Sequence, residues 1–337
     1  MDVTLFLVNK SMKLYLHVGP HKTGTTLIQK TLLDNQQAIF RKGLFYPKQF
    51  IRIFGHHEFR SKVEAFQLTD DDVRFLEHAG KDILLSSEDL ISLSQQHFEY
   101  LKDRLSTFEI EIIYAWRRGS KKMFSIWQEI VKHGGTETFF EYHFSHIAKP
   151  GTSAMLSPDV KLNMFSRVFG KQNIKIIDYD AAAEQDNLLE LFFGLVGITQ
   201  TEELVVPLSD KNASNRSLTF YDSELIRALN CVFAKIKNIH GPAVRVAFNE
   251  NRDKLSQDKL NSLLDIIKQD CINVNADKYF IDQRSEKVMC DNFAECIVNY
   301  KQNSLSTTFN VSGQKWLVDS KAFALVHSVS EELSHFL

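Results

Sequence analysis

One short loop near the N-terminus has residue types and a spacing that suit an anion. After the apolar run 13–18 and before a segment of helical periodicity, the chain reads Gly19, Pro20, His21, Lys22, Thr23, Gly24, Thr25 and Thr26. Such a strand–loop–helix junction binds anions in doubly wound folds, because backbone N–H groups point outward and the helix dipole favours negative charge. The loop therefore predicts a phosphate site.

The loop differs from the nucleotide P-loop, GxxxxGK[ST], at the lysine. Its two glycines have the same spacing, but Thr25 stands at the lysine position, and the lysine of the loop, Lys22, precedes Gly24 by two residues. This change removes the clamp on the β- and γ-phosphates, so ordinary hydrolysis of ATP or GTP is disfavoured. Asp178 and Asp180 are the candidates for a Mg²⁺ ligand, but acidic residues are common at strand ends, and we expect no metal.

A second basic segment follows a later strand. The predicted strand 109–115 leads into Trp116, Arg117, Arg118, Gly119 and Ser120, and then into a helix that carries Ser125. Arginine offers a two-pronged donor to phosphate, and a serine two turns into a helix can face back toward it. Cations at a helix start are unfavourable, so this basic start favours a bound anion. Two such sites suit a nucleotide with phosphates at both ends of its ribose.

Together these motifs resemble the bacterial-type sulfotransferases that use PAPS (3′-phosphoadenylyl sulfate). In that family a K-[ST]-G-T motif before a helix binds the 5′-phosphosulfate, and Lys22, Thr23, Gly24 and Thr25 match it. The resemblance implies that Lys22 bonds the bridging oxygen and helps the phosphate to leave, without a metal. It implies that Arg117 and Ser125 bind the 3′-phosphate. The donor-binding residues are then His21, Lys22, Thr23, Gly24, Thr25, Thr26, Arg117, Ser125 and Arg216.

The resemblance covers residues 13 to about 230 and is vague beyond. The run 161–198 resembles the family's helix–strand–helix, and the run 212–217 resembles a polar turn of its bacterial members. An RKG-type loop, which adds a contact to the 3′-phosphate in cytosolic members, is not recognisable here. Arg216, or alternatively Lys211, is the substitute that we consider for that contact.

Sulfuryl transfer to a hydroxyl needs a base that takes the acceptor's proton. The candidates are His56, His57 and Glu88. Glu88 follows a strand end, where the active sites of parallel sheets gather, whereas a histidine has the better intrinsic pKa, near 6.5. A pair is also possible, in which Glu88 orients one of the two histidines. His21 and Glu58 come next.

The pattern of elements predicts how these residues are positioned. Strands are expected at 13–18, 82–86, 109–115 and 173–178, and helices at 25–35, 95–105, 120–133, 158–169 and 186–196, with another that ends near Gly80 and is capped by Asp70, Asp71 or Asp72. Alternating strands and helices indicate an α/β three-layer sandwich with a central parallel sheet and a P-loop-like core.

The C-terminal part has a different pattern. Segments 216–238, 255–272 and 285–301 look helical with no clear strand between them, and 307–337 is left unassigned. We therefore expect an N-terminal extension at 1–11, an α/β core at 12–206 and a mainly helical part at 207–337 that packs on the core.

Composition excludes several classes. The 337 residues contain 40 Lys and Arg against 42 Asp and Glu, with 44% hydrophobic residues, which excludes collagen-like, low-complexity and disordered chains. The near-neutral charge argues against a nucleic-acid partner. Without a transmembrane stretch, a signal peptide or a CxxC pair among Cys231, Cys271, Cys290 and Cys296, a reduced, cytoplasmic protein is expected. Together with the segments that resemble bacterial members of the family, the missing membrane anchor implies a bacterial protein.

The predicted function is transfer of the sulfuryl group from PAPS to a hydroxyl of a glycan, glycolipid or small metabolite. The acceptor site is expected in loops 45–70 and 134–157 and in the C-terminal part. Two alternatives remain open. One is a small-molecule kinase, which would need a metal and a lysine at position 25. The other is a nucleotide-binding regulator that has lost its base.

Overall fold

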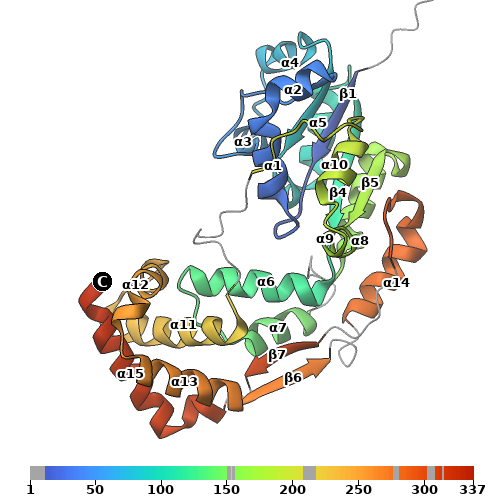
Figure 1. Ribbon diagram of the computed structural model, residues 1–337. Coiled ribbons are helices and arrows are strands. Elements are labelled where there is room, and N and C mark those ends of the chain that lie inside the picture. The colour runs from blue at the N-terminus through green and yellow to red at the C-terminus, as the bar shows by residue number, and fades with distance from the viewer. Residues whose placement is uncertain are drawn as a thin grey trace, which may run out of the picture. The chain divides into compact units, whose positions relative to one another are not determined.

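The computed structural model describes residues 12–149, 153, 156–207, 218–275, 281–301, 308–312 and 315–337 (Figure 1). The chain forms two compact units, and each is discontinuous in sequence. The first comprises Met1–Arg117, Pro158–Ser209 and Val288–Gln302, and the second comprises Arg118–Ser157, Asp210–Lys287 and Asn303–Leu337. This division differs from a single boundary at residue 206. The expected extension 1–11 lies outside the described residues.

A five-stranded sheet forms the centre of the first unit. Its strands are β1 (Lys13–His17), β2 (Leu44–Phe45), β3 (Asp82–Ser86), β4 (Glu109–Trp116) and β5 (Ile174–Asp178). The order is β2-β3-β1-β4-β5, and every neighbouring pair is parallel, which confirms the predicted parallel sheet. From β1 the chain first builds β2 and β3 on one side and then β4 on the other. The loop after β1 therefore lies at the topological switch point, where such sheets bind ligands.

Helices cover both faces of this sheet. Along β1, Leu14 and Leu16 belong to one hydrophobic cluster and Tyr15 belongs to another, as the alternation of a strand requires. The Leu14 cluster includes residues of α3 (His57–Glu64), α4 (Asp70–Glu77), α5 (Gln95–Arg104) and α8 (Pro158–Phe169). The Tyr15 cluster includes residues of α1 (Thr25–Asp34), α2 (Gln36–Arg41), α9 (Tyr179–Glu184) and α10 (Leu188–Leu195). The three-layer prediction is confirmed.

A late segment of the chain pairs with the β5 side of the sheet. After α14 (Ile281–Phe293), Ile297 forms a parallel bridge with Ile176, and the Val298 N–H donates to the Ile176 carbonyl at 3.0 Å. The Asn299 side chain accepts from the Asp178 N–H at 2.7 Å and donates to the Asp178 carbonyl at 2.9 Å. Residues 297–299 thus satisfy backbone groups that the end of β5 would otherwise expose.

Two of the predicted helices differ in detail. Helix α4 is capped by Thr69 and not by an aspartate: Thr69 Oγ1 accepts from the Asp72 N–H at 3.1 Å, and the Asp72 carboxylate accepts from the Thr69 N–H at 2.9 Å. This reciprocal capping box uses two backbone donors at once. The helix expected at 186–196 is α10, and the separate helix α9 precedes it.

The second unit is mainly helical and also holds a two-stranded antiparallel sheet. Its elements are α6 (Gly119–Lys132), α7 (Phe139–Ile147), α11 (Phe220–Val232), α12 (Ala243–Asn251), α13 (Gln257–Gln269), α15 (Ser320–Leu333), β6 (Cys271–Asn275) and β7 (Thr308–Ser312). The expectation of no clear strand between the helical segments of 216–301 is wrong, because β6 directly follows α13 and pairs with β7, in the segment that was left unassigned. Over the described part of the chain, no helix combines the length and the apolar character that a membrane span needs.

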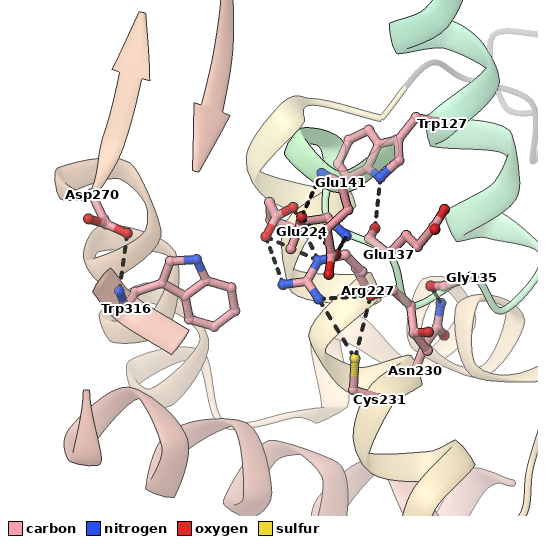
Figure 2. Close-up of polar contacts among 12 residues, drawn as sticks. Trp127, Gly135, Glu137, Glu141, Glu224, Arg227, Asn230, Cys231, Asp270 and Trp316 are labelled. Atoms are coloured by element: carbon pink, nitrogen blue, oxygen red, sulfur yellow. Dashed lines mark hydrogen bonds and ion pairs between the residues drawn. The ribbon is translucent and has the colours of Figure 1, made fainter. Parts of the chain in front are cut away.

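A buried ion pair lies on α11, inside the helical unit. Glu224 and Arg227 are almost fully buried and lie 3.0 Å apart, carboxylate oxygen to guanidinium nitrogen (Figure 2). Arg227 also donates to the Thr136 carbonyl at 3.1 Å, and its guanidinium lies 6.0 Å from the centre of the Trp316 ring. These contacts compensate the loss of water around both charges, which burial without partners would make very costly. They give the pair a structural role.

Candidate functional site

The loop after β1 has a backbone shaped for an anion. Gly19, Lys22 and Gly24 have positive φ angles of 79°, 65° and 76°. The Gly19 carbonyl accepts from the Ala115 N–H at 2.8 Å, so the loop is fixed to β4. Gly24 is the N-cap of α1, and within the described chain no side chain caps that helix. The first-turn N–H groups of α1 therefore suit a ligand with negative charge.

Both glycines of the loop are required by close neighbours. A Cβ on Gly24 would clash with the Leu188 side chain, and a Cβ on Gly19 would lie 2.9 Å from Cβ of Glu88. Positive φ angles add to this constraint, because side chains other than glycine rarely adopt them. The loop is thus held tightly between α10 and the end of β3.

The side chains of the loop divide into internal and outward ones. Thr23 is buried, and its hydroxyl donates to the Pro20 carbonyl at 2.6 Å. Thr25 is also buried, whereas His21 and Thr26 are exposed. A donor phosphate would therefore meet backbone N–H groups, Lys22 and Thr26 rather than the Thr23 hydroxyl.

Arg117, just past β4, contacts the loop directly. Its Nη1 donates to the Lys22 carbonyl at 2.7 Å. Its guanidinium lies 5.2 Å from the centre of the Tyr179 ring and 3.8 Å from the Asp180 carboxylate. The structure thus brings Lys22 and Arg117 together at the carboxyl ends of β1 and β4, although 95 residues separate them. Ser125 lies in α6, in the second unit, so its joint use with Arg117 stays a prediction.

The basic start of α6 has a different explanation from the one expected. The Ser120 N–H donates to the Asp282 carboxylate at 3.0 Å, the Ser120 hydroxyl donates to its other oxygen, and the buried Arg118 lies 3.4 Å from Glu286. Protein carboxylates therefore supply the negative charge there. No sequence pattern indicated Asp282, which is 162 residues from Ser120. Arg216 and the alternative Lys211 lie outside the described residues.

The end of β3 brings a second group of polar side chains to the same edge of the sheet. Glu88 and Asp89 begin a 3-10 turn, Glu88–Ser92. The Glu88 carboxylate accepts from the Gln29 side chain of α1 at 2.8 Å. His57, at the start of α3, has its Nδ1 3.0 Å from the Asp89 carboxylate. Glu88 and His57 therefore both lie near the phosphate loop, but the carboxylate that pairs with His57 is Asp89, which the sequence did not single out.

His56 is placed differently from its neighbour. Its side chain is buried, its Nδ1 accepts from the Ser86 N–H at 3.0 Å, and its Nε2 donates to the Pro47 carbonyl at 2.9 Å. Burial lowers its pKa to about 4. Both ring nitrogens are occupied by backbone groups, so His56 is unsuited to take an acceptor's proton. Its contacts join β3 to the loop that follows β2.

The two aspartates considered as Mg²⁺ ligands have protein partners. The Asp178 carboxylate accepts from the Ala181 N–H at 3.2 Å and caps α9, and Asp180 lies beside Arg117. Among the described residues, no three or more His, Cys, Asp or Glu side chains are grouped so that they could hold a metal ion.

An apolar cavity of about 490 Å³ lies at the β2 edge of the sheet. It is lined by Gln36, Gln37, Phe40, Phe45, Tyr46, Lys48, Gln49 and Phe75. The Tyr46 ring packs edge-on against the His56 ring, with centres 4.4 Å apart. The cavity therefore shares a wall with the segment that carries His56 and His57, and part of its lining belongs to the loop 45–70 expected to bind the acceptor.

Comparison with known proteins finds distant matches among solved structures, two of which are described here, and none among family models or curated sequences. No family model and no curated protein matches the chain. A crystal structure from Alicyclobacillus acidocaldarius has a TM-score of 0.38 and 11% identity, and covers 66% of this chain and 95% of its own. A mouse protein complexed with PAP has a TM-score of 0.33 and 14% identity, and covers 72% of this chain and 83% of its own. Both are sulfotransferases. Similarity this low does not decide an activity.

Proposed function

We propose that the protein is a sulfotransferase that moves the sulfuryl group of PAPS to a hydroxyl of its acceptor. The observation that carries this proposal is the junction of the two predicted anion-binding segments. Arg117 donates to the carbonyl of Lys22, within a loop that leads into the uncapped end of α1. A nucleotide with phosphates on both sides of its ribose fits two adjoining positive sites better than a nucleoside triphosphate does.

The loop would hold the 5′-phosphosulfate of the donor. The first-turn N–H groups of α1 and the side chains of His21, Lys22 and Thr26 would surround it. Arg117 would bind the 3′-phosphate with the part of its guanidinium that does not donate to Lys22, and Ser125 and Arg216 are the further residues proposed for that phosphate. Charge-assisted bonds of this kind are about twice as strong as neutral ones.

The transfer itself needs stabilisation of the leaving phosphate and removal of one proton. The acceptor oxygen forms a bond to sulfur while the bond from sulfur to the bridging phosphate oxygen breaks, which leaves adenosine 3′,5′-bisphosphate. Lys22 would neutralise the charge that grows on this leaving phosphate. His57 or Glu88, both near the loop, would take the proton of the acceptor hydroxyl.

The cavity beside β2 supports one proposal for the acceptor class. Its rings, Phe40, Phe45, Tyr46 and Phe75, favour an acceptor with an apolar part, so among glycans, glycolipids and small metabolites we propose a glycolipid. Screening hydroxyl acceptors with labelled PAPS tests this choice. Faster transfer to a bare glycan than to its glycolipid would contradict it.

Calorimetric titration tests the donor. Adenosine 3′,5′-bisphosphate should bind without a metal, and Arg117→Ala should weaken it by about 2 kcal/mol, with Ser125→Ala nearer 1 kcal/mol. Lys268→Ala, in α13, is a control that removes a positive charge elsewhere and should leave the affinity unchanged. Binding of ATP–Mg²⁺ in place of the bisphosphate would favour a kinase.

A further inference from the structure

We infer that Asp89 positions His57 as the base of the transfer and joins it to the donor loop through His21. This inference rests on the proposed function for the identity of the reaction. It adds a positioning residue that the sequence motifs do not indicate, and it decides between His57 and Glu88.

The contacts come from three separate elements. One oxygen of the Asp89 carboxylate lies 3.0 Å from Nδ1 of His57, at the start of α3. The other oxygen lies 3.2 Å from Nε2 of His21, in the loop after β1. Asp89 itself follows β3. One carboxylate thus serves two imidazoles, with one oxygen for each.

The carboxylate determines which nitrogen of His57 carries the proton. An ionised carboxylate can only accept, so Nδ1 of His57 must donate to it. The Ser87 hydroxyl, also 3.0 Å from this nitrogen, then lies beside an N–H and not beside a lone pair. In this tautomer Nε2 keeps its lone pair and can take a proton from an acceptor hydroxyl. Asp89 also stabilises the imidazolium that this transfer creates, as the aspartate of a catalytic triad does.

Glu88 lacks a comparable arrangement. Its carboxylate accepts from the Gln29 side chain, and its Cβ is the atom against which the loop packs at Gly19. These contacts suit a residue that fixes the loop. A histidine held by a carboxylate is the better base near neutral pH.

The contact to His21 places the base beside the donor loop. His21 directly precedes Lys22, so the carboxylate that holds His57 also contacts the loop proposed to bind the phosphosulfate.

The first test does not depend on enzymatic activity. It is ¹⁵N NMR of the imidazole nitrogens in the unliganded full-length protein. Wild type should show His57 with its proton on Nδ1. In Asp89→Asn the proton should move substantially to Nε2, whereas Asp71→Asn, a matched change at an exposed site on α4, should leave it in place. The same His57 tautomer in wild type and Asp89→Asn would overturn the inference.

Turnover gives the second readout. Asp89→Asn should lose roughly 100-fold or more in kcat while bisphosphate affinity stays within about twofold, and Asp89→Glu should recover part of the loss because it restores a carboxylate. Equal loss in both variants, or a loss of donor affinity instead, would contradict a positioning role. If wild type does not bind the bisphosphate, the proposed function fails while the NMR result still decides the Asp89–His57 pairing.

Discussion

Lys22 is the residue at which ground-state binding and catalysis should separate most clearly. Under the proposed function we expect Lys22→Ala to lower turnover by roughly 100-fold or more with little change in acceptor binding, because its charge would act mainly as the leaving phosphate forms. Single-turnover kinetics with labelled PAPS measures this. Lys268→Ala provides the control, and a loss of less than about tenfold in Lys22→Ala would mean that Lys22 is a surface residue.

We expect His56 to affect how the stability of the protein depends on pH, and not to take part in turnover. Its pKa of about 4, below the ordinary 6.5, means that the folded protein holds it neutral. The unfolded chain therefore binds the extra proton first as pH falls, so the stabilisation is complete above pH 6.5 and is lost between 6.5 and 4. His56 alone should lower the free energy of unfolding by about 3 kcal/mol over this pH range.

Urea unfolding at pH 7 and pH 4.5 checks this prediction. His56→Gln should have a lower free energy of unfolding than wild type at pH 7. Its free energy of unfolding should, however, fall less between pH 7 and pH 4.5 than that of wild type. Part of the pH dependence of the free energy of unfolding should remain in this variant, because burial also lowers the pKa of His17, to about 3. If the free energy of unfolding of His56→Gln falls between pH 7 and pH 4.5 as much as that of wild type, another group causes the pH dependence.

Residues close in sequence were predicted better than residues that meet through the fold. The loop at Lys22 and the segment at Arg117 each carry a local motif, and the structure brings them together. The pairing of Asp89 with His57 joins residues on different elements, and adjacent histidines cannot be sorted into buried and outward ones by sequence. The role of Asp282 could not be predicted from the sequence, because its partner Ser120 lies far away in the chain.

At the scale of elements, the junction of β1 and α1 depends on Gly24. We expect Gly24→Ala to destabilise the protein more than Gly80→Ala does. Both positions have positive φ, but a Cβ on Gly80 meets nothing within 4 Å, whereas one on Gly24 clashes with Leu188. The φ change alone should cost on the order of 1 kcal/mol, and the clash adds to it. Thermal unfolding of both variants measures the difference, and equal losses would mean that α10 moves aside.

Hydrophobic periodicity predicted the helices and strands with a clear apolar pattern. It failed for short elements and for segments in which a helix is directly followed by a strand. The four predicted strands and helices α1, α5, α6 and α8 are present because each has a continuous apolar face or core run. Strand β6 was merged with the helix before it, since a five-residue strand is too short to show a period of its own. Helices α7 and α12 follow glycine-containing turns and were not predicted.

At the scale of the whole molecule, residues distant in sequence complete the first unit. Asn299→Ala should remove two hydrogen bonds to the Asp178 backbone, 121 residues away, and cost about 1–3 kcal/mol. Hydrogen exchange at the Asp178 amide should accelerate more than exchange at β1. Unchanged protection of Asp178 would mean that water replaces the asparagine without loss.

The division of the chain into interleaved units has a consequence for its synthesis. When the ribosome has made the sheet strands, the segment Val288–Gln302 that belongs with them has not yet been translated, and the helical unit still lacks its last segment. Until Val288–Gln302 is made, the backbone groups of β5 that pair with residues 297–299 stay without these partners. We therefore expect the first unit to complete its fold late in synthesis and its nascent form to bind chaperones that shield strand edges.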